Sequence, residues 1–398
     1  MPFGVGKPFD VITETFAEPA LNYGATAVQI IFGAWFGRVL VDTGIAASLS
    51  YRTAKIGKKN PVLATICVAL VTCLIFTSAY GVGSAIAIGV ILFPIMGSIG
   101  VPKRVAVPVF TLSIGAAMWV NSVLFVQFAA FYQDYKGPDG QVVAWGPHYL
   151  RFGIPAMIVQ MLGIIIYILI NSKAIKNGKP YQLGSAEHQM TEADVPQVPV
   201  YTYILPLVPV ALSIILQWNS VPALIVATLL AFLLTGHMKT FKGFVKDLNG
   251  TATTAIGDIG PLLIMLFVLQ FFQHSAITVM KDFGPLLTPI IPNNEILLAV
   301  IFCVLAPLAL FRGPLELYGA GAAIISIFMS MGVFNAWFLF ALLVVPSMTC
   351  ISACITQSWN MWAAQYAGLE PKTFLKNGVP VYWACTFPIM ALAGLLLF

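Results

Sequence analysis

The amino-acid sequence predicts an all-α polytopic membrane protein with two inverted-topology repeats. The 398 residues are 59% hydrophobic and only 9% charged, whereas a soluble chain carries about 25% charged residues. Apolar runs near the roughly 20 residues that cross a bilayer recur along the chain. In addition, the motif Tyr80-Gly-Val-Gly-Ser-Ala-Ile86 returns as Tyr318-Gly-Ala-Gly-Ala-Ala-Ile324 at an offset of 238 residues.

The apolar runs predict about 10–12 helical segments. Several runs are too long or too rich in glycine to form one straight helix, so we expect glycine-broken helices or re-entrant hairpins. The predicted segments are residues 20–50, 61–79, 80–100, 105–132, 150–171, 201–217, 220–236, 252–280, 296–311, 314–334, 335–365 and 379–398.

The glycine motif belongs to a longer duplication. At the same offset, Val107-Pro108 pairs with Val345-Pro346 and Thr111 pairs with Thr349. A helix-breaking motif in corresponding places of two halves points to a transporter's binding site, because freed backbone groups at membrane depth must line a cavity. We divide the chain into a first repeat (1–171), a cytoplasmic linker (172–199) and a second repeat (200–398).

The loops set the orientation of the repeats. If each apolar run crosses once, the lysine- and arginine-rich loops all fall on one side, which the positive-inside rule makes cytoplasmic. The run 20–50 then crosses inward while its counterpart 252–280 crosses outward, so the repeats are inverted. We expect the protein to lie in the cytoplasmic (inner) membrane. The runs 201–217 and 220–236 have no counterpart before residue 20. They either form a linking pair or, as we expect, indicate that the chain lacks two amino-terminal helices.

Two ionisable residues interrupt an otherwise apolar stretch from residue 296 to 331. Arg312 and Glu316 directly precede the second glycine motif. Charged groups at membrane depth are costly and therefore mark functional sites. Arg312 is a candidate to grip a substrate carboxylate through two parallel hydrogen bonds. The alternative is that Arg312 snorkels to the cytoplasmic interface with Glu316 as its partner one turn away.

The glycine motifs supply further candidates for substrate binding. Helix amino-termini present unpaired N–H groups and a positive dipole end, which favour an anion. Close helix packing through small residues is the alternative use of such a motif. The candidate residues are Gly81, Gly83, Ser84, Gly319 and Gly321.

The segment after each hairpin is unexpectedly polar. Asn121, Thr356, Gln357 and Asn360 are candidates for substrate binding, since buried amides need several hydrogen bonds. Hydroxyl groups can replace the water shell of a coupling cation or simply bond to their own helix, which makes Thr111, Thr349 and Ser352 ion-coupling candidates.

Of two acidic positions within apolar segments, Asp258 allows both a functional and a structural interpretation, and Asp42 a structural one. Asp258 stands in Ile256-Gly-Asp-Ile-Gly-Pro261, which we expect to interrupt a helix. Its carboxylate is either a cation-coupling group or a cytoplasmic helix cap. Arg38 and Asp42, four residues apart, predict a structural ion pair.

The stretch Phe32-Gly-Ala-Trp-Phe-Gly-Arg-Val-Leu-Val-Asp-Thr-Gly44, followed by a lysine-rich loop, an apolar helix and the glycine motif, resembles the ion transporter superfamily. The gluconate permease and citrate/C4-dicarboxylate carrier families are nearest. The resemblance implies a secondary carrier of small organic anions, driven by protons or sodium and often dimeric. Phe311-Arg-Gly-Pro-Leu-Glu316 departs from the usual pattern of these families and leaves the substrate open.

We therefore expect a secondary active transporter that moves a sugar acid or a di- or tricarboxylate with H+ or Na+, as a homodimer without cofactor or resident metal. A channel or uniporter is the alternative. An intramembrane enzyme is less favoured, because no HExxH, paired aspartates or Ser–His motif is present. The six cysteines lie in apolar segments and predict packing. The net charge of +5 reflects membrane-facing loops, not a nucleic-acid partner.

Overall fold

The computed structural model describes residues 16–17, 21, 23–56, 60–133, 135–181, 196–287 and 291–398, which are helices and loops without a strand. Within this part, six helices are long and apolar enough to cross a membrane, or seven if one bent pair forms a single span. The chain is therefore an all-α polytopic membrane protein, as predicted. The amino-terminal stretch on which the expectation of missing helices rests lies mostly outside the described residues.

The helices of the first half end before the gap at residue 182. They are α2 (Gly24–Asp42), α3 (Ile45–Ile56), α4 (Pro61–Phe76), α5 (Val82–Ser98), α6 (Lys103–Ala117), η1 (Met118–Val120), α7 (Ser122–Ala129), η2 (Ala130–Tyr132), α8 (Pro147–Ile170) and α9 (Ser172–Lys176).

The helices of the second half follow residue 199. They are η5 (Val200–Leu207), α10 (Val208–Ile215), α11 (Ser220–Leu234), α12 (Phe241–Leu287), α13 (Glu295–Val304), η6 (Ala306–Arg312), α14 (Gly321–Met331), α15 (Ala336–Ala353), α16 (Ser358–Ala367) and α17 (Pro371–Leu396).

The two halves share an order of elements. In the first, the hairpin α4–α5 turns at a non-helical segment, residues 77–81, which we call the first tip. In the second, α13 and η6 lead through residues 310–320, the second tip, into α14. Each hairpin is followed by an interrupted helix, α6–α7 or α15–α16, and then by one long helix, α8 or α17. Whether the halves are inverted in a membrane stays a prediction.

Local chemistry explains where these helices start. Asn60 begins α4 by accepting from the Val62 and Leu63 N–H groups. Asn121 does the same for α7. An asparagine oxygen satisfies N–H groups that have no partner within the first helical turn. The predicted run 20–50 is divided at Gly44, whose φ of +79° ends α2, so the run forms two helices.

The predicted interruption at residues 256–261 is wrong. The 47-residue helix α12 runs through this stretch without a break, and it packs against α2 and α14. Tertiary packing of this kind overrides the weak helix propensity of glycine and proline. Asp258 consequently lies well inside α12 and is not a helix cap.

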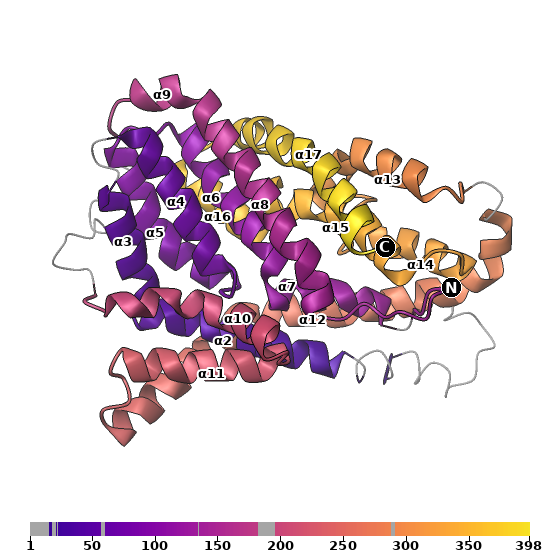
Figure 1. Cartoon of the computed structure of the whole chain (residues 1–398), viewed down its shortest axis with the longest axis horizontal. Helices are drawn as coiled ribbons and strands as arrows, with labels where there is room; N and C mark the ends of the chain where they lie inside the picture. Colours follow the sequence, from indigo (N-terminus) through magenta and orange to yellow (C-terminus); the bar gives the residue numbers. More distant parts are fainter. Residues whose placement is uncertain are drawn as a thin grey trace.

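The interrupted helices form the centre of the molecule. α6 packs against α15. In the most apolar windows of the stretches that contain these two helices, 89% and 94% of the residues are buried. In Figure 1, α2 and α12 lie side by side along one face with α11 beside α2. The yellow helix α16 reaches among the helices of the first half and contacts α5. The halves are thus interleaved, which brings the two tips toward the same region.

Candidate functional site

The second tip has an unusual backbone at its start. Phe311 and Arg312 have φ values of +58° and +60°, in the left-handed region that side chains other than glycine rarely adopt. Each such residue costs about 1–3 kcal/mol and persists only where the surroundings hold it. The two strained residues thus stand directly before Gly313, and the second of them is the candidate arginine.

The glycines of the second motif allow the tip to fold back on this arginine. A Cβ at Gly319 would lie 2.1 Å from the Arg312 carbonyl oxygen, and one at Gly321 would lie 2.5 Å from that of Glu316. Both glycine N–H groups donate to the Glu316 carbonyl oxygen over 3.0 Å. These two predicted anion donors are therefore engaged within the tip, and the absence of a Cβ lets each glycine pack against the backbone of Arg312 or Glu316.

Arg312 joins the second tip to the break between α15 and α16. Its Nη1 donates to Glu316 Oε1 over 2.9 Å and its Nη2 donates to Gln357 Oε1 over 3.0 Å. The guanidinium carbon lies 5.6 Å from the Tyr318 ring centroid, within cation–π range. The Arg312 side chain is 29% exposed while Glu316 is fully buried. A planar guanidinium suits these simultaneous contacts, which a lysine ammonium would not reproduce.

Two cysteines that the sequence assigned to packing belong to this cluster. Cys354 Sγ accepts from the Phe311 N–H over 3.2 Å and contacts Thr356 Oγ1 over 3.1 Å. Cys350 lies one helical turn earlier, 3.9 Å from the same hydroxyl. The i,i+4 spacing of the two thiols just before a helix break was the available signal. It pointed to no site, because no histidine or carboxylate is interleaved with the two cysteines.

The two motif tyrosines converge on a residue that sequence reasoning missed. Tyr80 and Tyr318 both donate to Gln127 Oε1, over 3.1 and 3.2 Å. The Gln127 amide nitrogen is held by the Val123 carbonyl oxygen. A fully buried glutamine in an apolar run requires partners, and this was the only hint in the sequence. Each copy of the glycine motif thus contributes one hydroxyl to a shared acceptor.

The tips also contact the interrupted helix of the opposite half. Tyr80 of the first tip meets the Trp359 ring edge-on, with centroids 6.1 Å apart. Tyr318 of the second tip stacks on Phe128 of α7 at 5.3 Å. Conversely, the amide at each break binds the tip of its own half. Asn121 Nδ2 donates to the Phe76 and Ala79 carbonyl oxygens at the end of α4 and in the first tip. Gln357 Oε1 accepts a hydrogen bond from Arg312 of the second tip.

The first tip and the first turn of α5 bring together the predicted residues Gly81, Gly83 and Ser84 with Asp258. Gly81 has φ +98° and ψ 159°, a conformation essentially restricted to glycine. Ser84 Oγ donates to the Tyr80 carbonyl oxygen over 3.2 Å. A Cβ at Gly83 would lie 2.2 Å from Asp258 Oδ2. The exposed Asp258 carboxylate therefore lies against the first turn of α5, where the helix dipole favours negative charge.

The other predicted polar residues are divided among separate contacts. Thr111 donates to the Pro108 carbonyl oxygen of its own helix, and Ser352 accepts from Gln160 Nε2. Asn360 Nδ2 donates to the carbonyl oxygens of residues 351 and 354 across the helix break. Thr349 Oγ1 and Asn360 Oδ1 are buried without a partner in the described structure. Among the described residues, no hydrogen bond joins Asp258, Thr111, Thr349 and Ser352 to one another.

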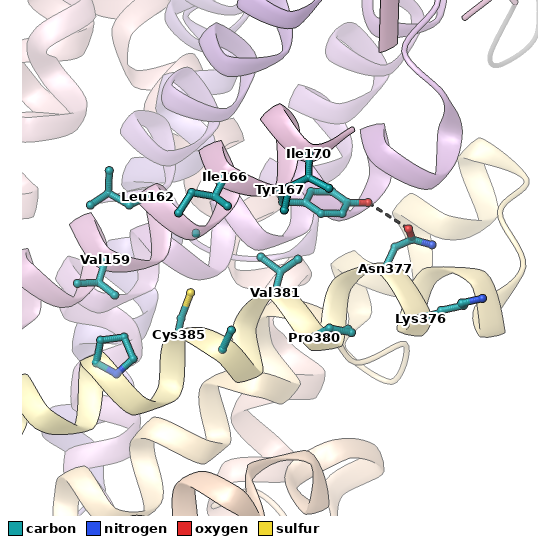
Figure 2. A pocket seen from close by; sticks show the side chains of 13 residues that line it. Val159, Leu162, Ile166, Tyr167, Ile170, Lys376, Asn377, Pro380, Val381 and Cys385 are labelled. Atoms are coloured by element: carbon teal, nitrogen blue, oxygen red, sulfur yellow. Dashed lines mark hydrogen bonds between the residues drawn. The ribbon is translucent and has the colours of Figure 1, made fainter. Parts of the chain in front are cut away.

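A groove of about 540 Å³ lies apart from the tips, between α8 and α17. In Figure 2, the aliphatic side chains of both helices line its length, and the Tyr167 hydroxyl meets the Asn377 side chain at one end. Lys376 lies at the same end. None of the predicted site residues lines this groove. A mainly apolar lining of this kind is unsuited to a desolvated carboxylate.

Comparison with solved structures finds this fold in the crystal structure of the Alcanivorax borkumensis YdaH transporter, described as having an unusual topology. The two chains align with a TM-score of 0.61 and 13% identity over 98% of this chain and 89% of that one. No protein-family model and no curated protein matches the sequence. The likeness is one of fold, and membership of the ion transporter superfamily stays a prediction.

Proposed function

We propose that this protein is a secondary active transporter that moves a small organic anion, a sugar acid or a di- or tricarboxylate, across the cytoplasmic membrane with H+ or Na+. The observation that carries this proposal is the Arg312 guanidinium. It is partly exposed in an otherwise apolar region and is held by Glu316 and Gln357 where a hairpin tip meets a broken helix.

Several features support a carrier. Non-helical backbone is tolerated at membrane depth where it lines a cavity or is buried in protein, and here the tips of both halves reach Gln127 of the interrupted helix α6–α7. The fold is shared with a protein described as a transporter. An anion entering this region requires an arginine, a helix dipole or a co-bound cation to offset its desolvation. Arg312 supplies such a group for an anion.

Uptake into proteoliposomes tests the proposal. Purified protein would be reconstituted and supplied with radiolabelled gluconate, galacturonate, fumarate, succinate or citrate under an inward H+ gradient, an inward Na+ gradient or neither. We expect saturable uptake of at least one anion, accelerated by one gradient. Non-saturable flux that depends on neither gradient would favour a channel. Absence of uptake for all five anions would reject the substrate class.

Equilibrium binding provides an independent test of coupling. The affinity for each transported anion would be measured at low and high sodium, and separately at two pH values in matched buffers. If a cation and the anion share a site, each raises the affinity of the other by the same factor. An anion affinity that neither cation changes would favour a uniporter.

A further inference from the structure

We propose that Glu316 carries the coupling proton, and that a substrate carboxylate and the Glu316 carboxylate alternate as the partner of Arg312. This inference rests on the proposed function. It adds the identity of the coupling ion and the residue that holds it.

The two oxygens of the Glu316 carboxylate have different surroundings. Oε1 receives the Arg312 Nη1 hydrogen bond, whereas Oε2 is buried with no hydrogen-bond partner in the described structure. A buried ionised carboxylate is tolerated only when it is paired, and removing its partner is strongly destabilising. Arg312 therefore favours the charged form of Glu316 against the burial of the carboxyl group, and Oε2, which has no hydrogen-bond partner, is the oxygen that would take up a proton.

Few other groups face this carboxylate. From its own tip these are Arg312, the Tyr318 backbone N–H and the Tyr318 phenol, and from α15 they are the thiols of Cys350 and Cys354. Arg312 is the only cationic side chain in this set. Whether Glu316 is ionised consequently depends on whether the Arg312 guanidinium pairs with it or with another anion.

Arg312 is placed to change partners without leaving the tip. Its second nitrogen, Nη2, is bound to the neutral Gln357 amide, a contact that can persist whichever anion pairs with the guanidinium. The arginine side chain is 29% exposed, while Glu316 behind it is fully buried. An incoming anion can thus reach the guanidinium but not the glutamate.

The exchange balances in charge and protons. A substrate carboxylate pairs with the guanidinium, and one proton binds Glu316 Oε2, which converts the carboxylate to a neutral carboxylic acid. Neither Arg312 nor Glu316 is left as an unpaired buried charge in either state. When the substrate leaves, Glu316 releases the proton and pairs with Arg312 again. One proton therefore moves with each anionic charge that Arg312 neutralises.

The first experiment needs no substrate. Infrared spectra of the purified protein would be recorded across a pH series for wild type, Arg312→Gln and the double variant Arg312→Gln with Glu316→Gln. We expect the Arg312→Gln variant to show a carboxylic-acid C=O band that persists to higher pH than in wild type and is absent from the double variant. If the arginine substitution leaves Glu316 ionised as in wild type, the exchange is rejected even if transport is observed.

The second experiment separates anion exchange from proton-driven accumulation. Proteoliposomes would be tested with the same five anions, and an internal dye would report proton entry. With Glu316→Gln, we expect counterflow exchange to continue while accumulation driven by a proton gradient falls about tenfold or more. Glu316→Asp, which keeps a titratable acid, should remain proton-coupled even if it is slower.

Asp42→Asn is the matched control, because Arg38 and Asp42 form an i,i+4 ion pair of 2.8 Å outside the tips. It should retain both exchange and accumulation. Accumulation by Glu316→Gln that still follows the proton gradient, or by wild type that follows only sodium, would overturn the assignment. Failure of all five anions to enter would reject the proposed function, while the infrared series would still decide the protonation of Glu316.

Discussion

Tyr80 and Tyr318, which occupy the same place in the two glycine motifs, donate hydrogen bonds to one atom, Oε1 of Gln127. The two bonds join hairpin tips from opposite halves through a residue of α7. Because both hydroxyls and the amide are buried, neither tip can move away without leaving a polar group unpaired or finding it a new partner. The shared acceptor therefore ties the position of one tip to that of the other.

Gln127→Leu should destabilise the protein. It removes the acceptor of two buried hydroxyl groups, each of which costs about 1–3 kcal/mol when unpaired. Thermal unfolding in detergent would measure the loss. Gln365→Leu at an exposed position of α16 is the control and should change stability little. Equal shifts for the two variants would show that the tyrosine contacts contribute nothing measurable.

Gly81→Ala should lower stability by about 1–3 kcal/mol through backbone strain alone. Space is not the limit, since the nearest neighbour of an added Cβ would be 3.9 Å away. Gly257→Ala in α12 has no heavy atom within 4 Å of the added carbon and should be stabilising by about 0.5–1 kcal/mol. Chemical denaturation of both variants tests the difference in sign. An unchanged Gly81→Ala would contradict the special conformation of the first tip.

Arg312→Lys should reduce uptake far more than Lys242→Ala, by about tenfold or more against little change. The lysine keeps the charge but loses the planar fork that contacts Glu316 and Gln357 together. Lys242 is an exposed residue near the start of α12. Initial uptake rates at equal protein density in proteoliposomes measure the ratio. Wild-type rates for Arg312→Lys would reassign the arginine to a structural role.

Gly115→Ala should destabilise the contact between α6 and α15, because the added Cβ would lie 2.1 Å from Ser352 Oγ and 2.8 Å from its Cβ. Ser352→Gly removes both obstructing atoms and should partly restore stability in the double variant. We expect a coupling of about 0.5–3 kcal/mol between the two positions. Unfolding free energies of the two single variants and the double variant measure it. Additive effects would mean that the helices separate to accommodate the methyl group.

Predictions from the sequence succeeded where the chemistry is local. A segment that crosses a bilayer must form a helix of about 20 residues, and the apolar runs therefore located most helices. The duplicated glycine motif located both tips. The Arg38–Asp42 pair formed as its i,i+4 spacing predicted, and the Arg312–Glu316 pair formed as in the structural alternative considered for Arg312. Asn121 was found as a buried amide, although its contacts show a helix-capping role.

Tertiary structure decided what joins these local features. The bond from Tyr318 to Gln127 spans 191 residues and that from Arg312 to Gln357 spans 45, and hydrophobic periodicity carries no information about such partners. Packing against α2 and α14 also kept α12 continuous through Asp258, against its glycines and proline. Sequence determines helices because each backbone group finds its partner within four residues. The site depends on side chains that meet only when the two halves interleave.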